Sequence, residues 1–293
     1  QENPWDVLAI DDLREIETLF NMYQFYDAAR RAKEAEEQLQ QKKPFFAALA
    51  VAAEGFQKWD DFRHGEALKQ LRKAESKFRD IASIAEHGSI PAFQQSLAFA
   101  LQELQAINNE LQLLNKTADH RDAHVADPLR LPLDLIANAK RRAKQDRFDD
   151  AVARLYGAVE KIAKLRLWFV YGVDNAKVRP EQIPDEGLRK RLCQENGEQD
   201  GRLKLPLFKS YELLQSLQDE VGLRFGERQD ELKKLLDIRN KSILAHGLHP
   251  VSRKTYEQML DITQDFLGVG DEALPRFPEM RWQGLGYDVW WSR

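Results

Sequence analysis

The chain has 293 residues, of which 43% are hydrophobic and 31% are charged, as is ordinary for a folded protein of one large or two ordinary domains. The formal net charge of −4 argues against a protein that coats nucleic acid through bulk positive potential, so any nucleic-acid contact must be local. The single cysteine, Cys193, excludes an internal disulfide framework and a multi-cysteine zinc site.

The hydropathy pattern predicts a cytoplasmic protein. No apolar run approaches the roughly 18 residues needed to span a bilayer, and the first residues lack a basic segment followed by an apolar one. The sequence does not begin with Met, so we expect a fragment or a processed chain whose upstream part is missing.

The first part of the sequence has a helical period. Apolar residues recur at i, i+3, i+4 and i+7 through residues 11–41, 45–87 and 90–115, which predicts about five helices before residue 117. Residues 116–132 are polar, lack a sustained period and contain two prolines, which indicates a connector. We therefore predict two domains, residues 1–125 and residues 126–293.

The second part is also helical. The pattern predicts helices over residues 132–145, 147–172, 207–222, 227–247 and 252–268. Residues 173–206 read as loop with one or two short helices, and the tail 274–293 reads as irregular and rich in tryptophan. Strand signals are nearly absent, so the predicted fold class is all-α.

One weak internal similarity joins the two parts. Residues 24–39 and 146–162 both place the pattern aromatic-x-Asp-Ala-Ala/Val at the start of an amphipathic helix. Two copies this far apart do not make a repeat array, so we interpret them as two helical hairpins.

The most informative stretch is 232–250, LKKLLDIRNKSILAHGLHP. Leu232, Leu235, Leu236 and Ile243 recur at helical spacing, and Arg239 and His246 fall on the same stripe. Seven residues advance a helix by about 700°, so these two side chains lie within roughly 20° of each other. Ser242 falls on the same side, Asn240 lies about 100° round, and Gly247 is a suitable helix stop that would place His246 in the last turn.

Spacing alone does not establish a site. An arginine followed at this distance by a histidine is expected by chance about once in a chain of this composition. The arginine could instead pair with a buried carboxylate, and a histidine in the last turn is commonly a cap.

The amino-acid sequence of this stretch resembles a known family motif. DIRNKSILAHG resembles the Arg-Asn-x(5)-His signature of HEPN ribonucleases, and specifically the form found in the CRISPR-associated CARF–HEPN proteins of type III systems. The resemblance extends to residues 134–167 and 205–217, and covers roughly residues 130–268. It implies a multi-helix HEPN-like bundle, here preceded by a region of helical hairpins.

In that family a sensor domain that binds cyclic oligoadenylate precedes the nuclease domain. The sequence shows no alternating strand and helix pattern and no glycine-rich phosphate loop, so we expect the sensor, and with it the cyclic oligoadenylate activator, to lie outside this chain. The first 117 residues then either extend the nuclease domain and join it to the sensor, or form a separate partner-binding domain.

The resemblance also implies a chemistry. It assigns Arg239 and His246 as catalytic residues with Asn240 beside them, in an endoribonuclease that cleaves single-stranded RNA without metal or cofactor by attack of the 2′-hydroxyl. His246 would move protons, Arg239 would hold a phosphate and Asn240 would orient it. The family acts as a two-fold dimer, so we expect a homodimer in which this stripe points into the subunit interface. The alternative is a noncatalytic helical module that binds RNA or a protein, which a monomeric core ion pair at Arg239 and His246 would favour.

Other candidates are weaker. The basic runs 139–147 and 188–192 could line an RNA groove, although such runs are usually solvated faces of helices. His120 and His124 have a metal-compatible spacing but no third ligand nearby, which favours a solvated loop. The tryptophans of the tail could stack on bases, but tail aromatics more often pack back onto the protein.

Overall fold

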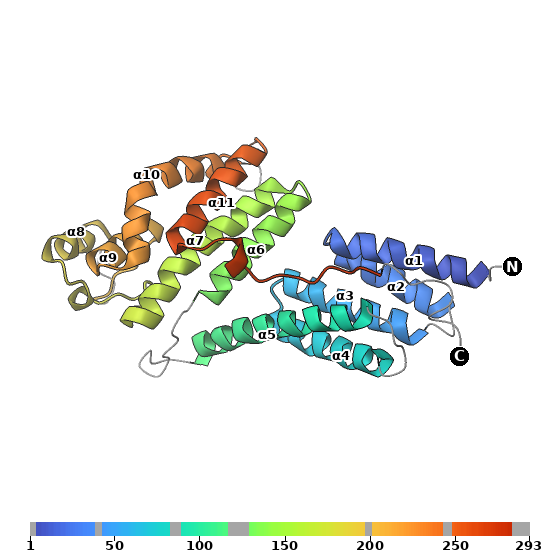
Figure 1. The fold of residues 1–293 in the computed structure, drawn as a ribbon. Coiled ribbons are helices and arrows are strands. Elements are labelled where there is room, and N and C mark those ends of the chain that lie inside the picture. Colours follow the sequence, from blue (N-terminus) through green and yellow to red (C-terminus); the bar gives the residue numbers. More distant parts are fainter. Residues whose placement is uncertain are drawn as a thin grey trace. The chain divides into compact units, whose positions relative to one another are not determined.

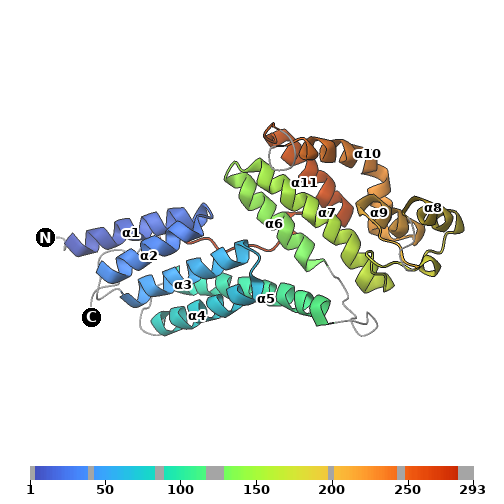
Figure 2. The same cartoon turned by 180° about the vertical axis from the view of Figure 1, so that it is seen from behind.

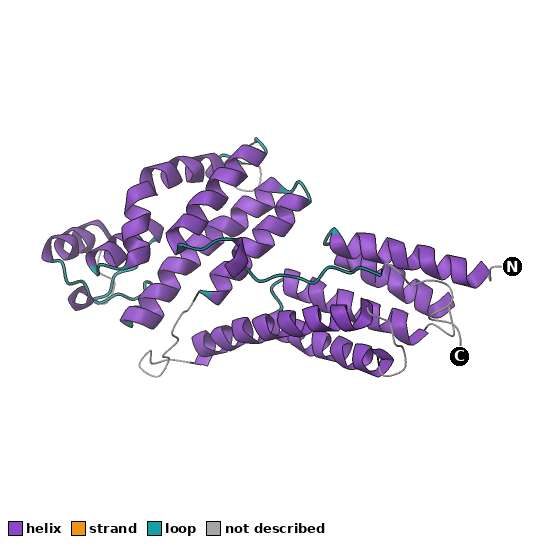
Figure 3. Cartoon of the chain, viewed as in Figure 1, coloured by secondary structure: helices purple, strands orange, loops and turns teal. Residues whose placement is uncertain are grey.

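A computed structural model describes residues 4–38, 43–82, 89–116, 129–196, 201–242 and 248–282. These residues form eleven α-helices and two short 3-10 helices, and no strand is found among them (Figure 3). The predicted all-α fold class is confirmed. None of the described helices is both long enough and apolar enough to cross a membrane.

The chain divides into two compact units. The first contains residues 1–108 together with residues 275–293, and the second contains residues 109–274. The predicted second domain includes the tail, but residues 275–282 pack in the first unit. The reason is apolar burial: the ring of Trp282 lies 5.2 Å from that of Phe45, and only 4% of Trp282 is exposed. This tail tryptophan therefore packs back onto the protein.

The five helices predicted before residue 117 are present, and the first unit holds all of them except the end of the fifth, residues 109–116, which belongs to the second unit (Figure 1). They are α1 (Pro4–Asn21), α2 (Phe25–Gln38), α3 (Lys43–Asp60), α4 (His64–Ala82) and α5 (Ser89–Lys116). Neighbouring helices pack in sequence order from α1 to α4. Their core is aromatic: the rings of Phe20, Phe56 and Trp59 are buried, and Phe277 of the tail packs 4.8 Å from Trp59.

The second unit contains the remaining helices (Figures 1 and 2). They are α6 (Arg130–Lys144), α7 (Phe148–Tyr171), α8 (Glu186–Asn196), α9 (Leu207–Ser216), α10 (Glu220–Asn240) and α11 (Arg253–Leu267), with 3-10 turns at Pro180–Gln182 and Asp271–Ala273. The long α7 is central, because α6, α9, α10 and α11 all pack against it. The single helix predicted over residues 207–222 is instead α9 and the first turn of α10, which are separated by residues 217–219.

One turn geometry closes four helical hairpins. In each, one residue other than glycine has a left-handed φ between 56° and 61°, and the residue after it donates its N–H to a carbonyl five residues back. At Asp146, for example, the Arg147 N–H lies 3.0 Å from the carbonyl oxygen of Arg142. The four residues are Tyr23, Phe62, Asp146 and Gln218. The predicted hairpins at residues 24–39 and 146–162 are confirmed, since each of these helices follows such a turn.

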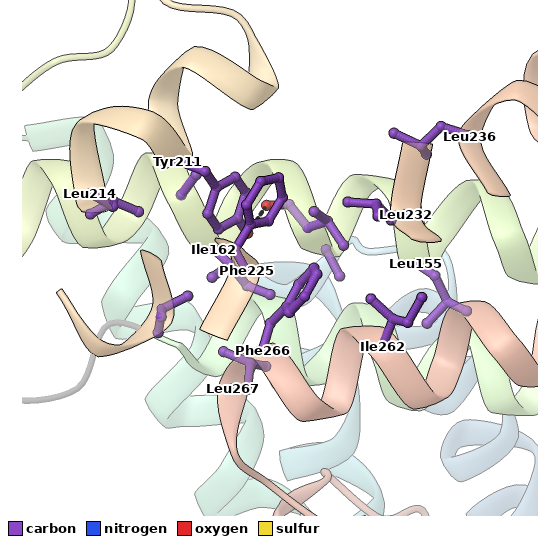
Figure 4. Packing of buried hydrophobic residues seen from close by; sticks show 14 of the residues in the cluster. Leu155, Ile162, Tyr211, Leu214, Phe225, Leu232, Leu236, Ile262, Phe266 and Leu267 are labelled. Carbon is purple, nitrogen blue, oxygen red and sulfur yellow. Dashed lines mark hydrogen bonds between the residues drawn. The ribbon is translucent and has the colours of Figure 1, made fainter. Parts of the chain in front are cut away.

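Aromatic stacking anchors the core of the second unit (Figure 4). Tyr211 of α9 stacks on Phe225 of α10 with ring centres 3.8 Å apart, and Phe266 of α11 lies 5.2 Å from Phe225. The Tyr211 hydroxyl donates to the Val159 carbonyl oxygen at 2.8 Å, so its buried polar group is satisfied. This cluster fixes α9, α10 and α11 on α7.

Candidate functional site

The helix that carries Arg239 is anchored at its first turn. Asp219, which is 1% exposed, caps α10 by accepting the N–H groups of Val221 and Gly222 at 2.9 and 3.3 Å. Its other carboxylate oxygen accepts Arg166 Nε at 2.9 Å and the Tyr171 hydroxyl at 3.0 Å. Asp219 therefore caps α10 with one carboxylate oxygen and connects the helix to α7 with the other, through a charged hydrogen bond.

The leucine stripe of α10 points into the core of its own unit. Leu232, Leu235 and Leu236 are 0%, 4% and 6% exposed, and they belong to the cluster in Figure 4. The expectation that this stripe points into a subunit interface is therefore wrong for the leucines. They pack inward because α7 and α11 present apolar faces to α10. Arg239 follows them by one helical turn, where the core ends.

The predicted end of this helix is also wrong. Instead of continuing to His246, α10 ends at Asn240, and the N–H of Ser242 donates to the Arg239 carbonyl oxygen at 3.0 Å. Ser242 is buried and forms an isolated β-bridge with His249. Because bridge pairing needs extended backbone, the chain leaves the helix before it reaches Ser242.

Several predicted residues lie outside the described part of the chain. His246 is one of them, with Ile243 and Gly247, so its proximity to Arg239 stays a prediction. His120 and His124 are likewise outside. Within the described residues, no group of three or more His, Cys, Asp or Glu side chains is arranged to hold a metal ion.

Arg239 and Asn240 lie together at the end of α10. Arg239 Nη1 donates to Asn240 Oδ1 at 3.1 Å, so the two side chains are in contact. Arg239 is half-buried, and Asn240 is exposed. No carboxylate of the described residues forms an ion pair with Arg239. The alternative that Arg239 pairs with a buried carboxylate therefore does not hold for these residues. A guanidinium in this state can bind an anion with its remaining N–H groups.

Tyr156 of α7 holds the Arg239 side chain and was not predicted from the sequence. The guanidinium carbon lies 4.7 Å from the centre of the Tyr156 ring, within cation–π range. The Tyr156 hydroxyl donates to Glu160 Oε1 at 2.7 Å. Burial, and then the hydrogen bond and charge of Glu160, raise the pKa of Tyr156 to about 12 although Arg239 opposes the shift. The phenol therefore stays neutral near pH 7.

The two basic runs have mainly structural roles. In 139–147, Arg141 and Arg142 are buried, and burial followed by the charges of Arg154 and Arg147 lowers the pKa of Arg142 to about 10. In 188–192, Lys190 pairs with Glu186 at 2.7 Å and Arg191 with Glu212 at 2.9 Å. The first run is therefore partly core, and the second is a solvated face with local ion pairs.

Two family models match the chain. The model described as the Csm6 HEPN domain matches residues 125–269, and the model described as the Csm6 6H domain matches residues 8–107. No curated protein matched the chain in a sequence search. The HEPN match contains α6 to α11, and therefore Tyr156, Arg239 and Asn240.

Proposed function

The chain belongs to the Csm6 family of type III CRISPR-associated proteins, whose HEPN domain implies a CRISPR-associated ribonuclease, and we propose that it cleaves single-stranded RNA without a metal ion. In this proposal Arg239, Asn240 and His246 carry the reaction. We also propose a domain boundary near residues 125 and 126, with a helical domain before it and the nuclease domain from there to about residue 274, because the tail packs in the first unit.

The observation that supports this function best is the state of Arg239. Its side chain is half-buried against Tyr156, while no carboxylate of the described residues neutralises it. A guanidinium that is held in place and has N–H groups free to donate can stabilise a phosphate whose negative charge increases in the transition state. A purely structural arginine would instead be expected to end on a carboxylate, as Arg166 does on Asp219.

The proposed reaction is a transesterification. The 2′-oxygen loses its proton and forms a bond to the adjacent phosphorus, the bond from phosphorus to the 5′-oxygen breaks, and a proton is delivered to that leaving oxygen. Arg239 stabilises the pentacoordinate phosphate and Asn240 orients one of its oxygens. His246 accepts or delivers a proton, because an imidazole titrates near neutral pH. The products are a 2′,3′-cyclic phosphate and a 5′-hydroxyl.

A two-proton reaction needs more than one imidazole in its site unless one group does both transfers. We therefore propose that two copies of the chain form a two-fold dimer in which the two motifs face each other, an arrangement in which the same patch is used twice. The buried leucine stripe does not take part in this interface, which is formed by the motif residues beyond it, Arg239, Asn240 and His246.

The test is cleavage of an end-labelled single-stranded RNA in EDTA. We expect the wild type to cut and His246→Ala to lose at least about a hundredfold of the rate, as removal of a general acid or base does. His249→Ala, a histidine close in sequence, is the matched control and should cut like the wild type. An RNA with 2′-deoxy substitutions should resist cleavage, and products lacking the cyclic phosphate would contradict the mechanism.

The dimer is tested with the same variant. Adding an excess of His246→Ala protein to a fixed amount of wild type should lower the cleavage rate, because mixed dimers contain one defective motif. An unchanged rate after full subunit exchange, or a monomer in analytical ultracentrifugation at micromolar concentration, would contradict the shared site. If neither protein cuts RNA although both bind it, the alternative of a noncatalytic RNA-binding module takes the place of the nuclease.

A further inference from the structure

A groove of about 710 Å3 opens beside the Arg239 site. It lies in the second unit between α7, the segment leading into α9, and α10, and both Tyr156 and Asn240 are among its lining residues. Both of these residues contact the Arg239 side chain. The groove is therefore continuous with the proposed catalytic position, and its volume lies in the range of about 300–1,000 Å3 typical of ligand-binding pockets.

The lining of this groove is basic. Among the described residues, five lysines and only two carboxylates line it, those of Glu160 and Asp237. The five are Lys161, Lys164, Lys204, Lys209 and Lys233. This local excess of positive charge stands in a chain whose net charge is −4, so it is a feature of the groove and not of the whole surface.

Three of the lysines have no carboxylate partner among the residues that the structure describes. Lys209 pairs with Glu195 at 2.7 Å and Lys233 with Asp230 at 3.2 Å. In contrast, the described residues form no ion pair with Lys161, Lys164 or Lys204. Lys164 and Lys204 are exposed and come from α7 and from the segment before α9, so they supply charge from two different elements of the groove.

Part of the remaining lining is apolar. Leu205, Pro206 and Leu236 contribute to it, together with the half-buried ring of Phe208. The Phe208 ring packs edge-on against Phe225 at 5.6 Å, which fixes it to the core of the unit. Apolar and aromatic surface beside cationic side chains is the combination that binds single-stranded nucleic acid, because bases stack on the former while phosphates pair with the latter.

We propose that this groove binds the RNA strand next to the bond that is cut, with the phosphates on Lys161, Lys164 and Lys204 and a base against the apolar lining near Phe208. This inference rests on the proposed function, because the strand is taken to run from the groove to a cleavage site at Arg239. A single strand fits this lining better than a duplex, whose bases are stacked on each other and cannot reach it.

The test is binding of a fluorescein-labelled single-stranded 2′-O-methyl RNA, which cannot be cleaved by 2′-hydroxyl attack. We expect Lys164→Ala/Lys204→Ala to weaken binding about tenfold at low salt, because two phosphate contacts are lost. The slope of log affinity against log salt should become shallower by about 1.4, since each phosphate contact with a single strand contributes about 0.7. Lys164→Arg/Lys204→Arg keeps both charges and should bind like the wild type.

The matched control is Lys234→Ala/Lys254→Ala, which removes two exposed lysines of the same unit that lie outside the groove lining. This control should keep both the affinity and the salt slope. Melting curves of all variants establish that they fold, as expected for exposed lysines. The groove proposal is overturned if the wild type does not bind the strand, or if Lys164→Ala/Lys204→Ala binds it as tightly as the wild type. It is also overturned if a duplex 2′-O-methyl RNA competes as well as the single strand.

Cleavage of unmodified RNA by the same proteins separates the two proposals. If the wild type binds the uncleavable strand through Lys164 and Lys204 but does not cut RNA, the groove stands and the nuclease function fails. If the wild type cuts and the groove variant binds and cuts equally well, the nuclease function stands and the groove is overturned.

Discussion

The guanidinium carbon of Arg239 lies 4.7 Å from the centre of the Tyr156 ring, so a residue of α7 holds the last arginine of α10. The contact links the fold to the proposed chemistry. The ring restricts a long, flexible side chain without neutralising its charge, and the Tyr156 hydroxyl is occupied by Glu160.

Removing either partner should lower RNA cleavage by different amounts. Arg239→Ala should reduce the rate by about a hundredfold to a thousandfold, as loss of a charge-stabilising donor does. Tyr156→Leu should reduce it by only about fivefold, because a cation–π contact between two half-buried side chains contributes about 1 kcal/mol. Tyr156→Phe keeps the ring and should retain most of the rate. Initial rates on a labelled RNA check all three.

A second stacked arginine provides the control. Arg253 of α11 lies 5.1 Å over the ring of Phe148, also on α7, and pairs with Asp146 at 2.9 Å. Arg253→Ala removes the same kind of contact from the same unit and should leave RNA cleavage unchanged. A loss of rate in this variant equal to that of Arg239→Ala would mean that stacking on α7, and not a phosphate contact, explains the effect.

The cap at Asp219 should be important for stability. Asp219→Ala removes the α10 cap and leaves Arg166 without its carboxylate, so we expect a loss of about 3 kcal/mol in the free energy of unfolding. Asp219→Asn keeps a capping oxygen and should lose less. Ser252→Ala, which removes the cap of α11 but no charge, should cost about 1 kcal/mol. Urea unfolding checks the order, and equal losses in the two alanine variants would contradict a contribution from the ion pair.

Buried tyrosines should make the protein less stable in alkali. Burial raises the pKa of Tyr211 well above its usual value, and burial together with Asp219 raises the pKa of Tyr171 to about 12. A group whose folded pKa is raised stabilises the fold fully below its unfolded pKa, near 10 for tyrosine, and loses that contribution as pH rises toward the folded value. The free energy of unfolding should therefore fall between about pH 10 and pH 12.

Tyr211→Phe separates this effect from general alkaline damage. It should cost about 1 kcal/mol at neutral pH, because the hydrogen bond to Val159 is lost. It should also make the decline above pH 10 shallower. Tyr26→Phe alters an exposed tyrosine and should leave the decline as it is. Urea unfolding at pH 8 and pH 11 provides the comparison, and parallel declines for Tyr211→Phe and the wild type would contradict the argument.

The sequence was sufficient for the fold class because amphipathic periods report directly on helices that pack side by side. It also placed Arg239 beside Asn240, which are neighbours in the chain. It could not find Tyr156, which lies 83 positions before Arg239, since a contact between two helices leaves no local pattern. The groove lysines were missed for the same reason: they come from three separate segments and form no basic run.

The end of α10 shows the limit of periodicity in another way. Apolar spacing continues past Asn240 through Ile243, so the pattern predicts more helix. The bridge between Ser242 and His249 ends the helix earlier, because pairing between these two residues depends on tertiary structure and not on local propensity. The same reason explains why the tail joined the first unit: burial of Trp282 against α3 and α4 could not be read from the order of the helices.

Two glycines of the second unit should respond to alanine in opposite directions. A Cβ built on Gly222, in the first turn of α10, would lie 2.6 Å from the backbone carbon of Leu214, which cannot move aside as a side chain tip could. We expect Gly222→Ala to destabilise the unit by about 1–3 kcal/mol through this overpacking. A Cβ on Gly157 of α7 would meet nothing within 4 Å, so Gly157→Ala should stabilise the helix by about 0.5–1 kcal/mol. Calorimetric melting of the full chain measures both shifts; a higher melting temperature for Gly222→Ala than for the wild type would contradict the close approach of α10 to α9.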